Sequence, residues 1–543
     1  MSSVFDLPKS VEELGSLNDD MTRVSYQQVS ATRDVVGANF PNGTQHYKFT
    51  TGSTQWWIPA RSYLRMRVSI EKVGGAALDV GDDIAPNMGI CANLFQSAEI
   101  RLQGKTISRI SDFLPQIDAL ETRLSKSKSY LDSTGASLNL WQPSVAERQT
   151  VMAQGCPILN KSGAKKVTRT SLANPNQVAV AAGGVFTFTQ NGGTAIPNLT
   201  NTFSRGDTAK IVLDAGGGVA GTTYTIEVAA VGAATLTSSS SQAAVGATNI
   251  LTLEKIEPVS ATRAKQDIEL IWTPPLALMK HDKALPTGAW ELVLTPHNSS
   301  AYQKYGIESS LSDKTTGNGG NFQLSVDQVF FYCATVEGKR FEEGSYMLDL
   351  DHTTCQVNTV DQATFGQKDF TVSPSTYALT AAYQDGRVGT DTRISSTKFR
   401  SYQNGVAGVI PADTAVVPQE LNLQRFFINY NSQNFPQPDA DPEFDTEKDY
   451  TAQRYAETQI MSGCMFDTGG CETIQEYHDR GSYYHFRCPQ DAGNRATRVI
   501  VHQGFKAPVE LNNNRLLLFS HHKSVMYVSV KDGQVLSVDV EEM

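Results

Sequence analysis

The sequence predicts an all-β protein: two jelly-roll β-sandwiches in tandem, with short helical excursions and an inserted small β subdomain. Three observations support this fold class. The chain has 543 residues, which is long enough for two sizeable cores. Short runs of alternating apolar and polar residues recur along it, and 42 Gly and 22 Pro are spread among them. These runs group into two blocks of about eight, the number of strands in one jelly roll.

The first block is expected at residues 45–335, after an N-terminal arm at 1–44. Its clearest strand is Ser62–Val73, because Leu64, Met66, Val68 and Ile70 alternate with polar residues. Residues 98–108 predict one strand bent at Gly104. The further strands of this block are expected at 46–51, 53–59, 266–273, 290–296 and 322–337.

Two stretches break the β pattern and predict helices. In Phe113–Leu131, the residues Leu114, Ile117, Leu120 and Leu124 recur at helical spacing, and Asp112 is the expected N-cap. In Thr446–Met461 the expected buried stripe is Tyr450, Tyr455 and Ile460.

Residues 173–256 differ from the rest of the chain in composition. They are rich in Ala, Gly, Thr, Ser and Val and contain few charges. Short β-branched runs bounded by turn residues favour a small β subdomain inserted into the first sandwich. The alternative is a disordered, low-complexity linker.

The second block is expected at residues 336–543 and ends in three strands at 515–520, 525–530 and 534–540. The turn at 531–533 contains Asp532-Gly533, which is typical of a tight hairpin. His521 and His522 are placed in a turn between two late strands, where side chains are normally exposed.

Charge and targeting signals narrow the function. The net charge is −10, and the arm is acidic too, so we expect no direct nucleic-acid binding. The first residues lack a secretory signal, and no apolar run approaches the length of a membrane span. The seven cysteines form an odd, scattered set, which favours a reduced protein made in the cell interior and not secreted.

Three motifs resemble chemical sites only weakly. Gly104-Lys105-Thr106 resembles the end of a phosphate loop, but Glu99 stands where such a loop needs Gly, and the segment is predicted as strand. The other two are cysteines and histidines with long gaps, and an acidic run that resembles a calcium loop but has Phe444 in place of the turn glycine. Their members are Cys464, Cys471, His478, His485 and Cys488, and Asp439, Asp441, Glu443 and Asp445. We therefore predict no catalytic, cofactor-binding or metal-binding residues and no cofactor.

Five stretches together resemble a known family. They are YKFTTGSTQWWIPARSYLRMRVSI (47–70), ELIWTPPLALMKHDKALPTGAWELVLTP (269–296), FTVSPSTYALTAAYQD (370–385), LQRFFINYNSQNFP (423–436) and LLLFSHHKSVMYVSVKDGQVLSVDV (516–540). In this order and in both halves, they resemble the double jelly-roll major capsid proteins of small eukaryotic double-stranded DNA viruses: the virophage, Polinton-like virus and adintovirus type, distant relatives of hexon.

The resemblance implies a structural protein and not an enzyme. It implies a homotrimer of pseudo-hexameric shape, trimer–trimer contacts in an icosahedral virion shell, and penton and minor capsid proteins as partners. Whether a membrane lies inside the shell is left open. The insertion would build the outward tower of the trimer. The alternative is a multi-domain β-sandwich adhesin or carbohydrate-binding protein, in which Trp56, Trp57 or Trp141 stacks on sugars.

Overall fold

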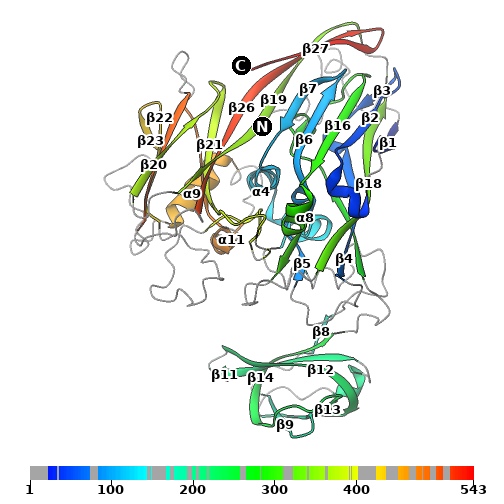
Figure 1. Ribbon diagram of the computed structural model, residues 1–543, viewed down its shortest axis with the longest axis vertical. Coiled ribbons are helices and arrows are strands. Elements are labelled where there is room, and N and C mark those ends of the chain that lie inside the picture. The colour runs from blue at the N-terminus through cyan, green and yellow to red at the C-terminus, as the bar shows by residue number, and fades with distance from the viewer. Residues whose placement is uncertain are drawn as a thin grey trace.

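The computed structural model is mostly β-strand, and its strands form six sheets within the described residues (Figure 1). It describes residues 23–32, 36–73, 84–142, 148, 167–170, 176–191, 198–203, 207–216, 219–256, 265–281, 283–309, 322–338, 342–360, 365–390, 392, 394–400, 423–435, 451–463, 472–479, 481–489, 497–505 and 514–542.

The first sandwich has two main sheets, with the strand orders β1-β18-β4-β15 and β2-β16-β6-β7. Their bounds are β1 Arg23–Ser30, β2 Gln45–Phe49, β4 Tyr63–Lys72, β6 Phe95–Leu102, β7 Lys105–Ile110, β15 Lys265–Trp272, β16 Trp290–Pro296 and β18 Phe322–Glu337; β3 (Gln55–Trp57) also pairs with β18. Inward residues of both sheets, such as Met66, Ile100 and Leu292, are buried in one core. Numbered in chain order, these eight strands form sheets 1-8-3-6 and 2-7-4-5, which is the jelly-roll arrangement.

The second sandwich repeats this order, with sheets β19-β26-β21-β24 and β20-β25-β22-β23. Its strands are β19 Gly344–Thr359, β20 Phe365–Thr371, β21 Thr376–Asp385, β22 Leu423–Tyr430, β23 Gln433–Phe435, β24 Tyr483–Arg487, β25 Arg498–Phe505 and β26 Asn514–Lys531. A last strand, β27 (Gln534–Glu542), folds back on β26 through the predicted tight turn. Asp532 and Gly533 both have positive φ there, as this turn requires.

Both sandwiches carry their longest helices between the fifth and sixth strands. In the first these are α4 (Leu114–Ser125) and the short α5 (Lys128–Tyr130) and α6 (Ala136–Asn139); in the second they are α9 (Thr451–Ser462) and α11 (Ile474–Asp479). Smaller elements of the first half are α3 (Ile90–Asn93), α8 (Ser299–Gly306) and the 3-10 turns η1 (Gly37–Asn42), η2 (Pro59–Arg61) and η6 (Ala277–Lys280), with the strand pair β5 (Ile84–Pro86) and β17 (Ile307–Ser309). Within the described residues, no helix is long and apolar enough to cross a membrane.

Residues 167–256 contain a separate seven-stranded sheet between α6 and β15. Its strands are β8 Val167–Thr170, β9 Gln177–Ala181, β10 Val185–Thr189, β11 Thr208–Gly216, β12 Val219–Gly232, β13 Thr235–Ser238 and β14 Val245–Ile256. The order β11-β12-β13-β10-β9-β14 closes because β14 also pairs with β11, so six strands form a small barrel with its own core. Figure 1 shows this barrel projecting beyond one end of the sandwiches, away from β27. The described residues of the insertion therefore form mainly strands, not a structureless linker.

Several local predictions were wrong. Residues 23–30 were assigned to the arm but form β1, because they pair with β18 along their whole length. Residues 98–108 are not one bent strand: Gln103 and Gly104 have positive φ and make a tight turn between β6 and β7.

The predicted helix ends and exposures also differ. Phe113, at φ +59°, precedes α4 in place of Asp112 as N-cap, and no side chain caps this end. Tyr450 lies outside the described residues, and Ile460 is 46% exposed instead of buried. His521 and His522 are not in a turn, because β26 runs without a break through both, and His521 is buried.

Candidate functional site

The junction between the two sandwiches contains buried ion pairs and a group of hydrogen-bonded histidines. Part of it is apolar: Leu350, Phe519 and Met526 of the second sandwich belong to the same continuous core as the first. Helix α4 lies between the sandwiches (Figure 1). Three charged residues of α4 reach different partners: Arg123 pairs with Glu472, Asp118 accepts from Trp272, and Glu121 pairs with Lys280.

Arg123 of α4 makes a fully buried ion pair with Glu472. Arg123 Nη2 lies 2.8 Å from Glu472 Oε1, and its Nε is 3.1 Å from both carboxylate oxygens. The same guanidinium donates to the carbonyl of Gly481 at 2.7 Å and stacks over the ring of Tyr483 at 4.5 Å. A planar group with several donors suits this enclosed, bidentate contact. Gly481 is obligatory there, because a Cβ atom would lie 1.9 Å from the carbonyl oxygen of Phe399.

A second buried charge cluster surrounds Glu308. Its carboxylate accepts from Arg148 at 2.7 Å and from Lys398 of the second half at 2.7 Å. Burial opposes ionisation, but the two cations hold the pKa of Glu308 below its usual value. Nearby, Ser395 donates to Asn87 at 2.5 Å and Thr397 donates to the carbonyl of Met88 at 2.8 Å. The segment 394–400 is thus held to the first sandwich by specific hydrogen bonds.

Strand β27 links the other end of the junction. The N–H of Val535 donates to the carbonyl of Thr287 at 2.8 Å, and the side-chain amide of Gln103 donates to the carbonyl of Val535 at 2.5 Å. Lys105 Nζ lies 2.6 Å from Asp539 Oδ1. Lys105, part of the weak phosphate-loop resemblance, therefore serves an exposed contact between the two halves, at the start of strand β7 and not at a helix start.

A histidine cluster sits between α4 and the inner sheet of the second sandwich. We define it as His352, His485, His521 and His522 with the hydroxyls of Thr353 and Thr380. Thr380 Oγ1 lies 2.8 Å from His485 Nδ1 and 3.0 Å from His521 Nε2. Thr353 Oγ1 lies 3.1 Å from His521 Nδ1 and is hydrogen-bonded to Glu121 of α4. His352 and His522 stack with ring centroids 5.3 Å apart, and His352 Nε2 is 2.7 Å from Ser524 Oγ.

Glu121 sets the direction of the hydrogen bonds that run from it through Thr353, His521 and Thr380 to His485. Burial opposes its ionisation, but the charge of Lys280, 2.8 Å away, and the hydrogen bond from Thr353 hold its pKa at about 2. An ionised carboxylate only accepts, so Thr353 donates to Glu121 and accepts the Nδ1–H of His521. His521 Nε2 then accepts from Thr380, whose oxygen accepts the Nδ1–H of His485. Both histidines are neutral in this arrangement.

The aromatic residues proposed for sugar stacking do not support that role. Trp56, Trp57 and Trp141 are at most 2% exposed, so no ring face is available. The prediction failed because exposure was assumed for them, whereas all three lie in the interior.

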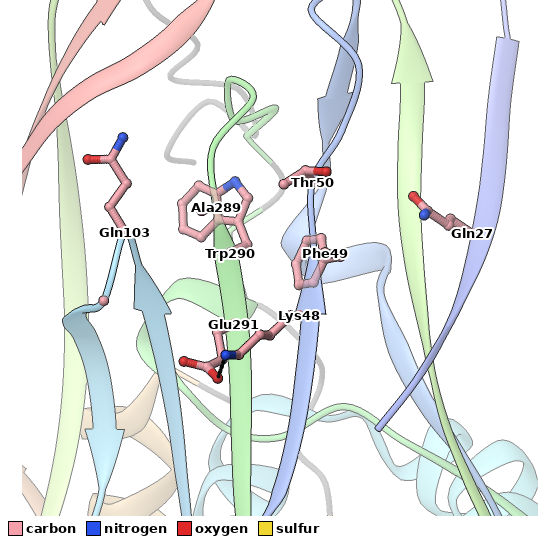
Figure 2. A pocket seen from close by; sticks show the side chains of 9 residues that line it. Gln27, Lys48, Phe49, Thr50, Gln103, Ala289, Trp290 and Glu291 are labelled. Atoms are coloured by element: carbon pink, nitrogen blue, oxygen red, sulfur yellow. Dashed lines mark ion pairs between the residues drawn. The ribbon is translucent and has the colours of Figure 1, made fainter. Parts of the chain in front are cut away.

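One open pocket of about 540 Å³ lies on the first sandwich (Figure 2). Lys48 and Glu291, 3.7 Å apart, line one side, and Phe49 and Trp290 line another. The two aromatic rings are buried, so this pocket too lacks an exposed stacking platform. Its carboxylate is already partnered, because Glu291 Oε1 also lies 3.0 Å from His46 Nδ1.

The two weak motifs of cysteines and histidines and of acidic residues lie only partly within the described residues. His485 and Cys488 are buried in and beside β24, His478 lies in α11, and Cys464 and Cys471 lie outside the described residues, as does the whole acidic run. Within the described ranges, no group of three or more His, Cys, Asp or Glu side chains is arranged to hold a metal ion. Sequence reasoning missed the pairs Arg123–Glu472 and Arg148–Glu308, and it did not bring His352, His485, His521 and His522 together in one cluster.

The strand orders define the class: this is a double jelly-roll protein, as the sequence predicted. Comparison with solved structures agrees. A chain of the Sputnik virophage cryo-EM structure matches with a TM-score of 0.50 at 10% identity, covering 97% of this chain and 90% of that one. At this identity the match concerns the fold alone.

Two further solved structures match more loosely. The mavirus major capsid protein has a TM-score of 0.44 at 10% identity, with 100% of this chain and 96% of that one covered. The Faustovirus major capsid protein has a TM-score of 0.44 at 9% identity, with 98% and 93% covered. No protein-family model matches the chain, and no curated protein matches its sequence.

Proposed function

We propose that this chain is a major capsid protein, the building block of an icosahedral virion shell. The observation that carries the proposal is the repeat of one topology: two jelly rolls of identical strand order, fixed to each other by a buried junction. Three such chains around a three-fold axis present six similar sandwiches, and this turns a trimer into a pseudo-hexagonal tile. A shell protein works through its geometry, so the functionally important region of this chain is the junction that fixes the two sandwiches relative to each other.

The proposed partners follow from this role. The first is the chain itself, in a homotrimer and then in trimer–trimer contacts; penton and minor capsid proteins would complete the shell. The net charge of −10 disfavours direct contact with a genome. The proposed location is the virion, after synthesis inside the host cell.

We assign the inserted barrel to the outward face of the trimer. It projects from the end of the sandwiches away from β27, and its closed sheet leaves few unpaired strand edges (Figure 1). A trimer density map without mass at that outer surface would contradict this placement.

Size-exclusion chromatography with light scattering tests the capsid role. The proposal predicts a species of three times the chain mass of 59.1 kDa, and spherical particles by negative-stain microscopy under assembly conditions. A stable monomer that is retained on a glycan column would instead support the adhesin alternative.

A further inference from the structure

We propose that the histidine cluster is a proton-binding latch that loosens the contact between the two sandwiches in acid. One bond closes this latch across the junction: Thr353 of β19 donates to Glu121 of α4, and Lys280 of η6, in the first sandwich like α4, holds the same carboxylate. His521 lies next to that contact and is hydrogen-bonded to Thr353. Protonation of the histidines therefore changes the hydrogen bonds that support the contact between Thr353 and Glu121. The inference does not depend on the capsid role.

The first added proton already forces the hydrogen-bond chain to rearrange. Imidazolium at His521 carries N–H groups on both nitrogens, so Nε2 can no longer accept from Thr380. The Thr380 hydroxyl must turn toward His485, which must move its own proton from Nδ1 to Nε2. A second proton, on His485, leaves Thr380 facing two N–H donors, with its own hydroxyl proton unpaired inside the protein.

The surrounding charges do not balance added protons. From α4 the group facing His521 is Glu121, which is already paired with Lys280 of η6. Arg487 of β24 is the charged neighbour of His485, and Tyr377 of β21 lies beside His521. The hydroxyl of Thr458 on α9 accepts from the backbone N–H of His485. His522 has the carboxylate of Glu542 on β27 in its neighbourhood, and its own stacked partner is another histidine, His352. Uptake of two or more protons therefore leaves excess positive charge in a buried site.

The sign of the pH effect follows from burial. Burial lowers the pKa of His521 and of His352 to about 4, from 6.5. Above pH 6.5 the folded and unfolded chains both keep these histidines neutral, so stability is intact. As pH falls from 6.5 toward 4, the unfolded or opened state takes up the proton first, and stability is lost. At pH 5 one such histidine shifts the equilibrium about 30-fold toward the open state.

Asp118, one turn before Glu121, has the opposite sign and must be separated from the latch. Burial raises the pKa of Asp118 to about 7, so acid stabilises the fold at this position. Whole-protein stability therefore mixes the two effects, whereas local exchange at the junction separates them. Asp118 faces Trp272 inside the first sandwich, and the histidine cluster faces the second.

Amide hydrogen exchange on the full-length protein at pH 7.5 and 5.0, corrected for intrinsic exchange, tests the latch. We expect amides of α4, β24 and the 514–522 part of β26 to exchange at least about tenfold faster at pH 5.0. Amides of β6 and β16 in the first sandwich should not change. His521→Gln should reduce the pH difference at α4, whereas His46→Gln, which replaces a partly exposed histidine on β2 of the first sandwich, should keep it.

An unchanged pH difference in His521→Gln, or no difference at α4 in the native protein, would overturn the proposal. If His521→Gln does not fold, exchange of the imidazole C2 proton in the native protein decides. A titration midpoint near 4 for His521 supports the latch, and a midpoint near 6.5 overturns it.

Discussion

The interior of each sandwich and the junction between them are built from different side chains. The interior is apolar and periodic: Leu64, Met66 and Val68 of β4 are fully buried, every second residue. The junction instead buries Arg123, Glu308 and Glu472, each with a charged partner at 2.7–2.8 Å. Apolar packing tolerates many orientations, whereas a bidentate ion pair accepts one.

This difference suggests a division of labour. The cores supply stability, and the junction fixes how the two sandwiches stand relative to each other. Buried ion pairs are poor sources of stability, because desolvation offsets their attraction. For the proposed capsid role, a fixed angle between the two sandwiches would offset that cost.

The largest predicted effect comes from breaking the junction on one side only. Arg123→Met removes the guanidinium that pairs with the buried carboxylate of Glu472, and we expect a loss of about 3–5 kcal/mol in the free energy of unfolding. The double variant Arg123→Met/Glu472→Leu removes both charges and should recover much of that loss. Urea unfolding measures both, and a single-variant loss below about 1 kcal/mol would show that this pair does not matter.

A smaller loss is expected inside a sandwich. Leu292→Ala on β16 opens a cavity in the first core but leaves no charge unpaired, so the expected loss is about 2–4 kcal/mol. Leu536→Ala is the matched control, because Leu536 is 65% exposed and should change stability by less than about 0.5 kcal/mol. Equal losses for the two variants in the same urea series would contradict the assigned core.

Asp118→Asn should stabilise the protein, with a defined pH dependence. The folded-state pKa of Asp118 is raised from 3.8 to about 7, so its stability contribution is full below pH 3.8 and lost as pH rises through 7. Asn stays neutral, and its side-chain oxygen can still accept from the indole N–H of Trp272, which lies 2.9 Å from Asp118 Oδ1 in the native protein. We expect a gain of about 1–3 kcal/mol at pH 8 and almost none at pH 4. A gain that is the same at both pH values would argue against a buried ionisable group.

The smallest effect is expected from removing the barrel. Its core, which includes Phe186, Ile211 and Leu236, is separate from the sandwich cores. Replacing residues 167–256 by a short Gly-Ser linker should change the unfolding free energy of the sandwiches by less than about 0.5 kcal/mol. Ile211→Ala in the intact chain is the partner experiment, since it should accelerate amide exchange in the barrel alone. Loss of sandwich folding on excision would contradict the separation.

The sequence predicted the interior well, because periodicity is local. Alternation in Ser62–Val73 identified β4 and its buried face, and Asp532-Gly533 identified the last hairpin. The same reasoning placed a helix at α4 and a β-rich insertion after it. Each of these signals lies within about a dozen residues of sequence.

The junction was missed because its partners are far apart in the chain. Arg123 and Glu472 are separated by 349 positions, and Arg148 and Glu308 by 160. Nothing local marks them as buried. His521-His522 interrupts an apolar run, so it resembled a turn, whereas tertiary pairing carries β26 through it. The prediction that Ile460 is buried was wrong for the opposite reason: this residue is apolar and at near-helical spacing, yet it faces outward.

Electron cryo-microscopy of the assembled protein tests the central claim most directly. We predict trimers in which six jelly rolls surround a three-fold axis, with Arg123 and Glu472 paired at each junction and the barrel on the outer face. Monomers, two-fold dimers, or sandwiches that vary in relative orientation from particle to particle would contradict it.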